Sequence, residues 1–241
     1  MIPGIAQLSR NGSRKVNEDT ADVSETGGWT LAVIADGLGG HQSGKLASQL
    51  AAETVKHYLW RQSAISSDAV REAVEAANRA VLAAQADAED DRKTTIAILC
   101  ASPRAVLCAH VGDSRIYCFR NGKIYYQTRD HSVSQAAVTV GEITQAQIRS
   151  HSDRNKLVRV LGANEQAAPD IHEFPIDRSD AFLLCSDGFW QLVYEDEMES
   201  ALEAAASAEI WLELMHTYLR QRLTDDSDNY SAIAFVPQMD G

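Results

Sequence analysis

The chain has 241 residues, 45% of them hydrophobic, so it is long enough to bury a sizeable core. Its formal net charge of −12 argues against nucleic acid as the main partner, because phosphate contacts need clustered Lys and Arg. No linker, repeat or low-complexity tract divides the sequence, so we expect one domain over residues 1–241.

The sequence shows neither a targeting segment nor a metal-binding cysteine motif. The N-terminal residues contain no long apolar core, and no segment is apolar enough to span a membrane, so neither a signal peptide nor a membrane span is expected. No cysteines form a CxxC pair, which makes a structural zinc site unlikely and favours reduced thiols in the cytoplasm. Nothing indicates an obligate partner, so we expect a monomer.

The first predicted elements are a strand and two helices. The apolar run at 29–35 is typical of a buried strand, and a glycine-rich loop follows it. A helix is expected over 43–61 and another over 68–86, with Ser67 as its N-cap. The apolar stripe of the first helix would consist of Leu46, Leu50, Val55 and Leu59.

Strands dominate the middle of the chain. Segments 94–101 and 105–111 are apolar and separated by a short turn, and 115–120 and 123–128 flank Asn121-Gly122. Asn-Gly between two such runs is the strongest short hairpin signal. Consecutive hairpins argue against a doubly wound parallel sheet.

The last third of the chain begins with a polar segment. Residues 131–162 have short helical patterns and few strand signals, which predicts an inserted subdomain or flap. Strands at 171–174 and 181–186, two helices within 195–223 and a final strand at 230–236 follow. The element order predicts an α+β sandwich in which helices cover the sheets.

Aspartates stand at the ends of several predicted strands. Asp36 and Asp187 each follow a strand and precede glycine, Asp113 follows Gly112, and Asp228 precedes the final strand. If these ends meet, the carboxylates repel one another, and bound cations relieve that repulsion. Oxygen ligands favour hard ions such as Mg²⁺ or Mn²⁺. Asp and Gly also favour ordinary turns, and the spacing alone leaves both interpretations open.

The ordered set of motifs resembles the PPM family of PP2C-type protein phosphatases, in its bacterial form. The matching motifs, which run across nearly the whole chain, are Arg14-Lys15-Val16-Asn17-Glu18-Asp19, Asp36-Gly37-Leu38-Gly39-Gly40-His41, Thr94-Thr95, Gly112-Asp113-Ser114-Arg115, Asp130-His131-Ser132, Ser186-Asp187-Gly188 and Asp228-Asn229-Tyr230-Ser231. The resemblance implies a four-layer αββα sandwich of two antiparallel sheets flanked by helices.

The resemblance also implies a metal-ligand set for two Mn²⁺ or Mg²⁺ ions. Asp36 would bridge both ions and the Gly37 carbonyl would bind one of them, while Asp187 and Asp228 would hold the other. Asp113 matches a position linked to a third, weaker metal, which it would share with Asp187.

Further implied roles lie in the N-terminal motif. Glu18 and Asp19 would order metal-bound waters, and Arg14 would bind the phosphate, which suits its planar guanidinium. Two positions depart from the family pattern. Lys93 stands where glycine is usual, and Leu38 stands where eukaryotic members carry a histidine proposed as general acid, so the general acid is unassigned.

The implied activity is hydrolysis of phosphoserine and phosphothreonine in proteins by direct attack of a metal-bridging water, opposing a Ser/Thr kinase. The amino-acid sequence of segment 130–162 resembles that of the phosphatases of type VI secretion loci. Two alternatives stay open. A non-catalytic regulator could bind phosphoproteins with the same fold. A nucleotide hydrolase is the other, because Gly39 to Lys45 nearly matches a P-loop, although Leu46 stands where Ser or Thr should bind Mg²⁺.

Overall fold

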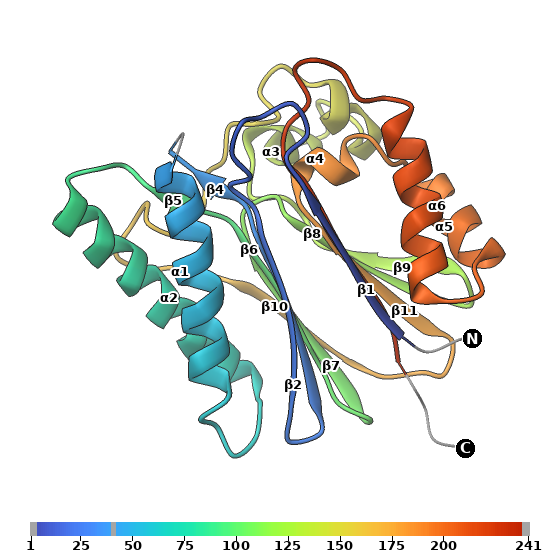
Figure 1. Cartoon of the computed structure of the whole chain (residues 1–241), viewed down its shortest axis with the longest axis horizontal. Coiled ribbons are helices and arrows are strands. Elements are labelled where there is room, and N and C mark those ends of the chain that lie inside the picture. The colour runs from blue at the N-terminus through green and yellow to red at the C-terminus, as the bar shows by residue number, and fades with distance from the viewer. Residues whose placement is uncertain (1–3, 40–41, 238–241) are drawn as a thin grey trace.

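The apolar segments of the sequence form the centres of two five-stranded antiparallel sheets. The computed structural model describes residues 4–39 and 42–237 (Figure 1). In order across the first sheet lie β1 (Gly4–Arg10), β12 (Tyr230–Val236), β11 (Asp180–Cys185), β8 (Arg115–Arg120) and β9 (Lys123–Gln127). The second sheet contains β10 (Asp170–Pro175), β7 (Ala105–Val111), β6 (Ile96–Ala101), β3 (Trp29–Ala35) and β2 (Thr20–Thr26).

The sheets pack face to face, because their inner faces are apolar. Ile34 and Leu99 of the second sheet and Phe182 and Ile233 of the first are fully buried in the shared cluster between them. The outer face of each sheet contributes to a second hydrophobic cluster, to which a pair of helices adds the remaining side chains. Alternation along the strands therefore supplies apolar side chains to both faces of each sheet.

Helices cover both outer faces, as the resemblance implied. Figure 1 shows α1 (Gln42–Leu59) and α2 (Ser67–Ala88) beside the second sheet, and α5 (Glu195–Ala204) and α6 (Ala208–Arg220) beside the first. The predicted four-layer αββα sandwich is confirmed. None of the helices in the described ranges is long and apolar enough to cross a membrane.

Most strand predictions are correct to within two residues. The hairpin at Asn121-Gly122 forms as expected, with φ of 52° and 76° at the two residues. Positive φ at both positions matches the right-handed twist of the flanking strands. Strands β1 and β2 were not predicted from the sequence. Both lie at sheet edges and are mostly half-buried, so their apolar signal is weak.

Two details of the helices differ from the predictions. The N-cap of α2 is Ser66 rather than Ser67, because the Ser66 hydroxyl accepts a hydrogen bond from the backbone N–H of Ala69. Leu46 of α1 is 47% exposed. Small residues, Ala47 among them, fill the buried face of α1 instead, which lets the helix pack closely on α2 and the sheet.

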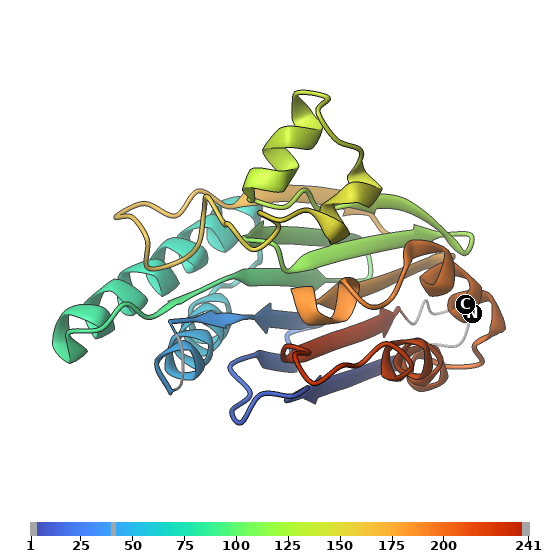
Figure 2. The same ribbon diagram turned by 90° about the horizontal axis from the view of Figure 1, so that it is seen from above.

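The segment 131–162 forms its own layer at one end of the sandwich. It contains α3 (Val133–Thr139) and the 3₁₀ helix η1 (Gln145–Ser150), which stand clear of the sheets in Figure 2. A single bridge between Thr94 and Leu161 holds its base to the rest of the chain, and a bridge between Ser132 and Leu157 pairs the two ends of the segment with each other. The short helix α4 (Asp187–Trp190), which was not predicted, lies at the same end (Figure 1).

Candidate metal centre

The backbone of Asp36 is fixed by two threonines, Thr94 and Thr95, that directly precede β6. The Asp36 N–H donates to Thr95 Oγ1 (3.0 Å), while the Thr94 hydroxyl and the Thr95 N–H both donate to the Asp36 carbonyl (2.9 Å each). Thr95 Oγ1 also lies 2.7 Å from the Ser114 hydroxyl, beside Asp113. These bonds connect the end of β3 to the turn between β7 and β8.

Gly37 allows three backbone segments to meet next to Asp36. It starts β4 (Gly37–Leu38), which pairs with β5 (Lys93–Thr94). A Cβ atom at Gly37 would lie 2.1 Å from the Gly44 carbonyl oxygen and 2.8 Å from that of Glu18. Only glycine fits this close approach. Gly40 and His41 of the same motif lie outside the described residues.

The four predicted aspartates converge on one pocket of about 460 Å³. Asp36 comes from the end of β3, Asp113 from the β7–β8 turn, Asp187 from the start of α4, and Asp228 from the residues before β12. Arg14, Glu18 and Gly37 also line this pocket. Seven of the eight predicted site residues therefore line the same pocket.

The eighth residue, Asp19, lies directly behind the pocket. Its side chain is 1% exposed and its Oδ2 accepts a hydrogen bond from the Ser186 hydroxyl (2.7 Å). Its Oδ1 is buried and has no hydrogen-bond partner among the described residues. An orphaned carboxylate oxygen at this depth is costly unless a water or a cation completes it.

The loop that carries Arg14 and Glu18 is organised by one amide side chain. Asn229 Nδ2 donates to the carbonyls of Asn11 (2.9 Å) and Val16 (3.0 Å), and its Oδ1 accepts from the Glu18 N–H (2.8 Å). The Asp-Asn pair at 228–229 therefore supplies a pocket carboxylate and also fixes the loop that carries Arg14 and Glu18.

Arg14 lies against an aspartate of the pocket. Its Nε donates to Asp228 Oδ1 (3.1 Å) and its Nη2 to Asp228 Oδ2 (3.0 Å). Both side chains are about half exposed, at 57% and 48%. The Arg14 guanidinium at the mouth of the pocket can bind two oxygens of an incoming anion with the same N–H groups if Asp228 is engaged by another partner.

Burial and mutual repulsion raise the pKa of four acids in or directly behind the pocket, namely Asp19, Asp36, Asp113 and Asp187. Burial is the main cause for all of them, and it lifts the pKa of Asp187 to about 6 and that of Asp19 to about 7. The pKa values of Asp36 and Asp113 are also raised well above the usual range, with further contributions from neighbouring aspartates. The Asp36 carboxyl is close enough to hydrogen-bond with Asp187.

This donor set fits divalent cations of the hard kind. The four aspartates that line the pocket offer oxygen ligands, and burial, together with the charge of neighbouring aspartates, raises the pKa of Asp36 and Asp113. The orphaned Asp19 Oδ1 lies behind them. Mg²⁺ and Mn²⁺ prefer such oxygen ligands and would remove the repulsion.

A second group of metal-ligating types, formed by His110, His131 and Asp170, does not fit an ion. Their ligand atoms lie within 4.8 Å of one another. The two rings are stacked, however, with centroids 4.5 Å apart and an interplanar angle of 24°. One ion cannot lie in the plane of two nearly parallel rings. His131 Nδ1 also accepts the Gly112 N–H (3.1 Å), so its Nε2 carries the proton.

Two pocket residues were not anticipated from the sequence. Asn155 and Leu157 of the segment 131–162 line the pocket, beside Lys15 and Leu38 of the predicted motifs. No local signal marks Asn155 and Leu157, because the return of the chain at the Ser132–Leu157 bridge brings them there. The segment that we expect to act as a flap thus contributes part of the pocket lining.

The P-loop alternative receives no support from the described residues. Lys45, which would contact phosphates in a P-loop, donates from Nζ to the Asp19 carbonyl (2.6 Å). Its ammonium group therefore braces the N-terminal motif from the first turns of α1.

Comparison with known protein families shows which family this chain resembles. A family model described as protein phosphatase 2C matches residues 7–225. Among curated proteins, the serine/threonine phosphatase stp of Listeria monocytogenes is 31% identical over 208 residues, which cover 82% of each chain.

Solved structures give the same result at the level of the fold. The catalytic domain of the serine/threonine protein phosphatase PstP, in complex with two manganese ions, superposes with a TM-score of 0.82 at 27% identity and covers 98% of this chain and 99% of its own. PppA of Pseudomonas aeruginosa, described as a key regulatory component of the type VI secretion system, has a TM-score of 0.80 at 27% identity, with 97% of each chain covered.

Proposed function

The chain belongs to the protein phosphatase 2C family and is a metal-dependent serine/threonine protein phosphatase, and we propose that its reaction takes place in the pocket formed by Asp36, Asp113, Asp187 and Asp228. The observation that carries this assignment is the convergence of these carboxylates, from four separate places in the chain, on one pocket where burial and neighbouring aspartates raise the pKa of Asp36 and Asp113.

In this proposal each side chain has a defined task. Asp36 would contact two ions, together with the Gly37 carbonyl, and Asp187 and Asp228 would complete their ligand sets, while Asp113 would share a third, weaker ion with Asp187. Glu18 and Asp19 would hold waters next to these ligands. Bound there, Mn²⁺ or Mg²⁺ would polarise the phosphoryl group and activate a water for in-line attack.

Arg14 would bind and orient the phosphate. In the structure its guanidinium grips Asp228. If Asp228 held a cation, the same two N–H groups would be available to two phosphate oxygens at the pocket mouth. No cysteine lies in the pocket, and all four are buried as free thiols, which supports direct hydrolysis without a phosphocysteine.

The decisive experiment compares hydrolysis of an aryl phosphate and of a phosphothreonine peptide with Mn²⁺, with Mg²⁺ and with chelator. We expect turnover that requires the metal and is lost in Asp36→Asn. The matched control is Asp22→Asn, because Asp22 pairs with Lys56 (2.9 Å) and is not a lining residue of the pocket. Absence of turnover from the folded protein under every metal condition would refute the assignment and favour a phosphoprotein-binding regulator.

The third ion has its own test. Asp113→Asn should keep two tight Mn²⁺ ions in a calorimetric titration and lose most of the turnover. Loss of all Mn²⁺ binding in this variant would show that Asp113 is required for the structure of the whole centre.

The physiological role we propose is removal of phosphate from proteins modified by a Ser/Thr kinase, in the cytoplasm and, by similarity to PppA, within type VI secretion control. The free thiols support a reducing compartment. The test is the phosphoprotein profile of cells that carry either the wild-type chain or Asp36→Asn. Phosphoserine and phosphothreonine should accumulate only with the variant, and unchanged profiles would refute this role.

A further inference from the structure

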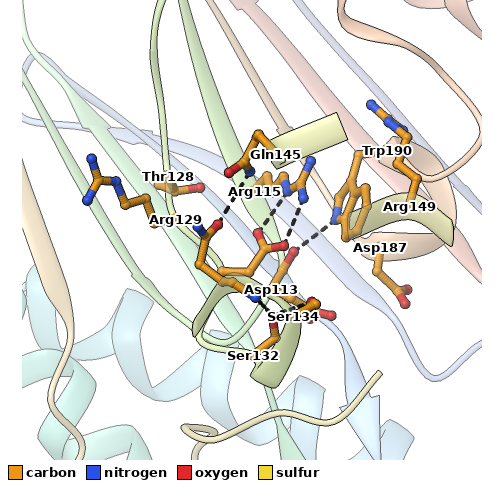
Figure 3. A network of polar contacts seen from close by, with 12 residues as sticks. Asp113, Arg115, Thr128, Arg129, Ser132, Ser134, Gln145, Arg149, Asp187 and Trp190 are labelled. Carbon is orange, nitrogen blue, oxygen red and sulfur yellow. Dashed lines mark hydrogen bonds and ion pairs between the residues drawn. The ribbon is translucent and has the colours of Figure 1, made fainter. Parts of the chain in front are cut away.

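The last residue of the short helix α4 and the residue after it contact two of the pocket aspartates, Asp113 and Asp187. The indole N–H of Trp190 donates to the main-chain carbonyl of Asp113 (2.9 Å), across the space between α4 and the β7–β8 turn (Figure 3). Trp190 is 1% exposed, so water cannot easily replace this bond. The backbone of the Asp113 turn is thus tied to the helix that begins with Asp187.

The residue after Trp190 binds the other aspartate. Gln191 Nε2 donates to Asp187 Oδ2 (2.9 Å), four residues earlier, on the same face of the helical turn. Its Oε1 accepts from Arg154 Nε (3.4 Å), in the segment 131–162. A donor on one side and an acceptor on the other fix the orientation of the Gln191 amide.

The indole ring is itself held in place. The guanidinium of Arg115 lies 3.5 Å from the centre of the Trp190 ring and donates to both carboxylate oxygens of Asp130 at 2.8 Å. Both members of this ion pair are buried, at 2% and 1% exposure. Figure 3 shows Trp190 between Arg115 and Arg149, with its N–H directed at Asp113. The ring therefore has little freedom to move away from the carbonyl.

We propose that Trp190 and Gln191 are positioning residues that set the distance and orientation between Asp113 and Asp187. The proposal rests on the proposed function, in which these two carboxylates share the third ion. Trp190 fixes the backbone from which the Asp113 side chain projects, and the hydrogen bond from Gln191 to Oδ2 restrains the rotation of the Asp187 carboxylate. Such supporting partners tune metal affinity although they never touch the ion.

The chain provides a matched control for Trp190. Trp211 is also fully buried and donates its indole N–H to a main-chain carbonyl, that of Met198 (3.0 Å), in the core formed by α5 and α6. Trp190→Phe and Trp211→Phe therefore remove the same chemical group from similar surroundings, but only the first lies next to the pocket. Gln191→Met keeps the length of the side chain and removes its amide, and it serves as the second test of the proposal.

Two quantities are measured. The first is Mn²⁺ binding to the metal-stripped protein, monitored through the electron paramagnetic resonance signal of the free ion. The second is the Mn²⁺ dependence of aryl phosphate hydrolysis. We expect Trp190→Phe and Gln191→Met each to weaken the lower-affinity binding phase by about tenfold, and to raise the Mn²⁺ concentration for half-maximal rate in parallel. Trp211→Phe should leave both quantities at the wild-type value, even where its thermal stability falls as much as that of Trp190→Phe.

Each other result has a defined meaning. Equal Mn²⁺ binding in wild type, Gln191→Met and Trp190→Phe would overturn the positioning role. An equal shift in Trp190→Phe and Trp211→Phe would also overturn it, since the effect would then follow from general destabilisation. If Trp190→Phe does not fold, Gln191→Met decides the matter alone. Wild-type protein that binds no Mn²⁺ would instead refute the proposed function.

Discussion

Replacing Asp187 by asparagine should stabilise the metal-free protein while abolishing its response to metal. The folded environment raises the pKa of Asp187 from 3.8 to about 6, chiefly through burial and then through the charge of Asp228. A carboxyl whose folded pKa is raised stabilises the fold below its unfolded pKa, and that contribution is lost as the pH rises through the folded pKa. The window of loss therefore runs from about pH 4 to pH 6.

The size of the effect follows from the two pKa values of Asp187. Ionised Asp187 lowers the free energy of unfolding of the metal-free protein by about 1 kcal/mol at pH 4.5 and by about 3 kcal/mol at pH 8. Asparagine carries no charge at either pH, and its amide oxygen can still accept the Gln191 N–H. We therefore expect the stability gain of Asp187→Asn over wild type to grow by about 2 kcal/mol between these pH values.

The assay is urea unfolding of metal-stripped wild type and Asp187→Asn at pH 4.5 and pH 8, repeated at pH 8 with Mn²⁺. Bound Mn²⁺ should reverse the order of stability, because an ion at one thousand times its dissociation constant adds about 4 kcal/mol to the wild type only. Asp22→Asn removes the ion pair with Lys56 and should not stabilise the protein. A stability difference between wild type and Asp187→Asn that stays constant with pH would refute the reasoning.

Three further predictions concern single side chains. Arg14→Ala should raise the KM for a phosphopeptide at least tenfold in steady-state kinetics while Mn²⁺ affinity by calorimetry stays the same, and an unchanged KM would exclude phosphate contact. Gly112→Ala should lower the urea-unfolding free energy by about 2–4 kcal/mol, because φ is +107° and the new Cβ would lie 2.6 Å from the Thr95 Cβ; wild-type stability would contradict this. Arg115→Met should cost about 3–5 kcal/mol in the same assay by leaving Asp130 buried without its partner, and the double variant with Asp130→Leu should recover most of it. If the double variant were no more stable than Arg115→Met, an unpaired charge would not be the cause.

Local sequence determined the central strands and their hairpins. The apolar runs at 29–35, 105–111 and 230–236 became strands with those bounds, because buried strands need continuous apolar, β-branched sequence. Asn121-Gly122 determined its hairpin, since few other residues adopt positive φ at both positions. Edge strands β1 and β2 escaped prediction because one face of each is partly open to water and the apolar pattern is diluted.

The sequence alone also named the acids that meet in the pocket, through motifs in family order. It could not show how they are supported. The hydrogen bonds from Trp190 to Asp113 and from Arg154 to Gln191, and the pairing of Arg14 with Asp228, join residues whose proximity depends on how the sheets and α4 pack. Periodicity and turn chemistry act within a few residues, whereas these contacts span up to 214 positions. Only the closed sandwich, which brings the ends of strands from both sheets together, decides them.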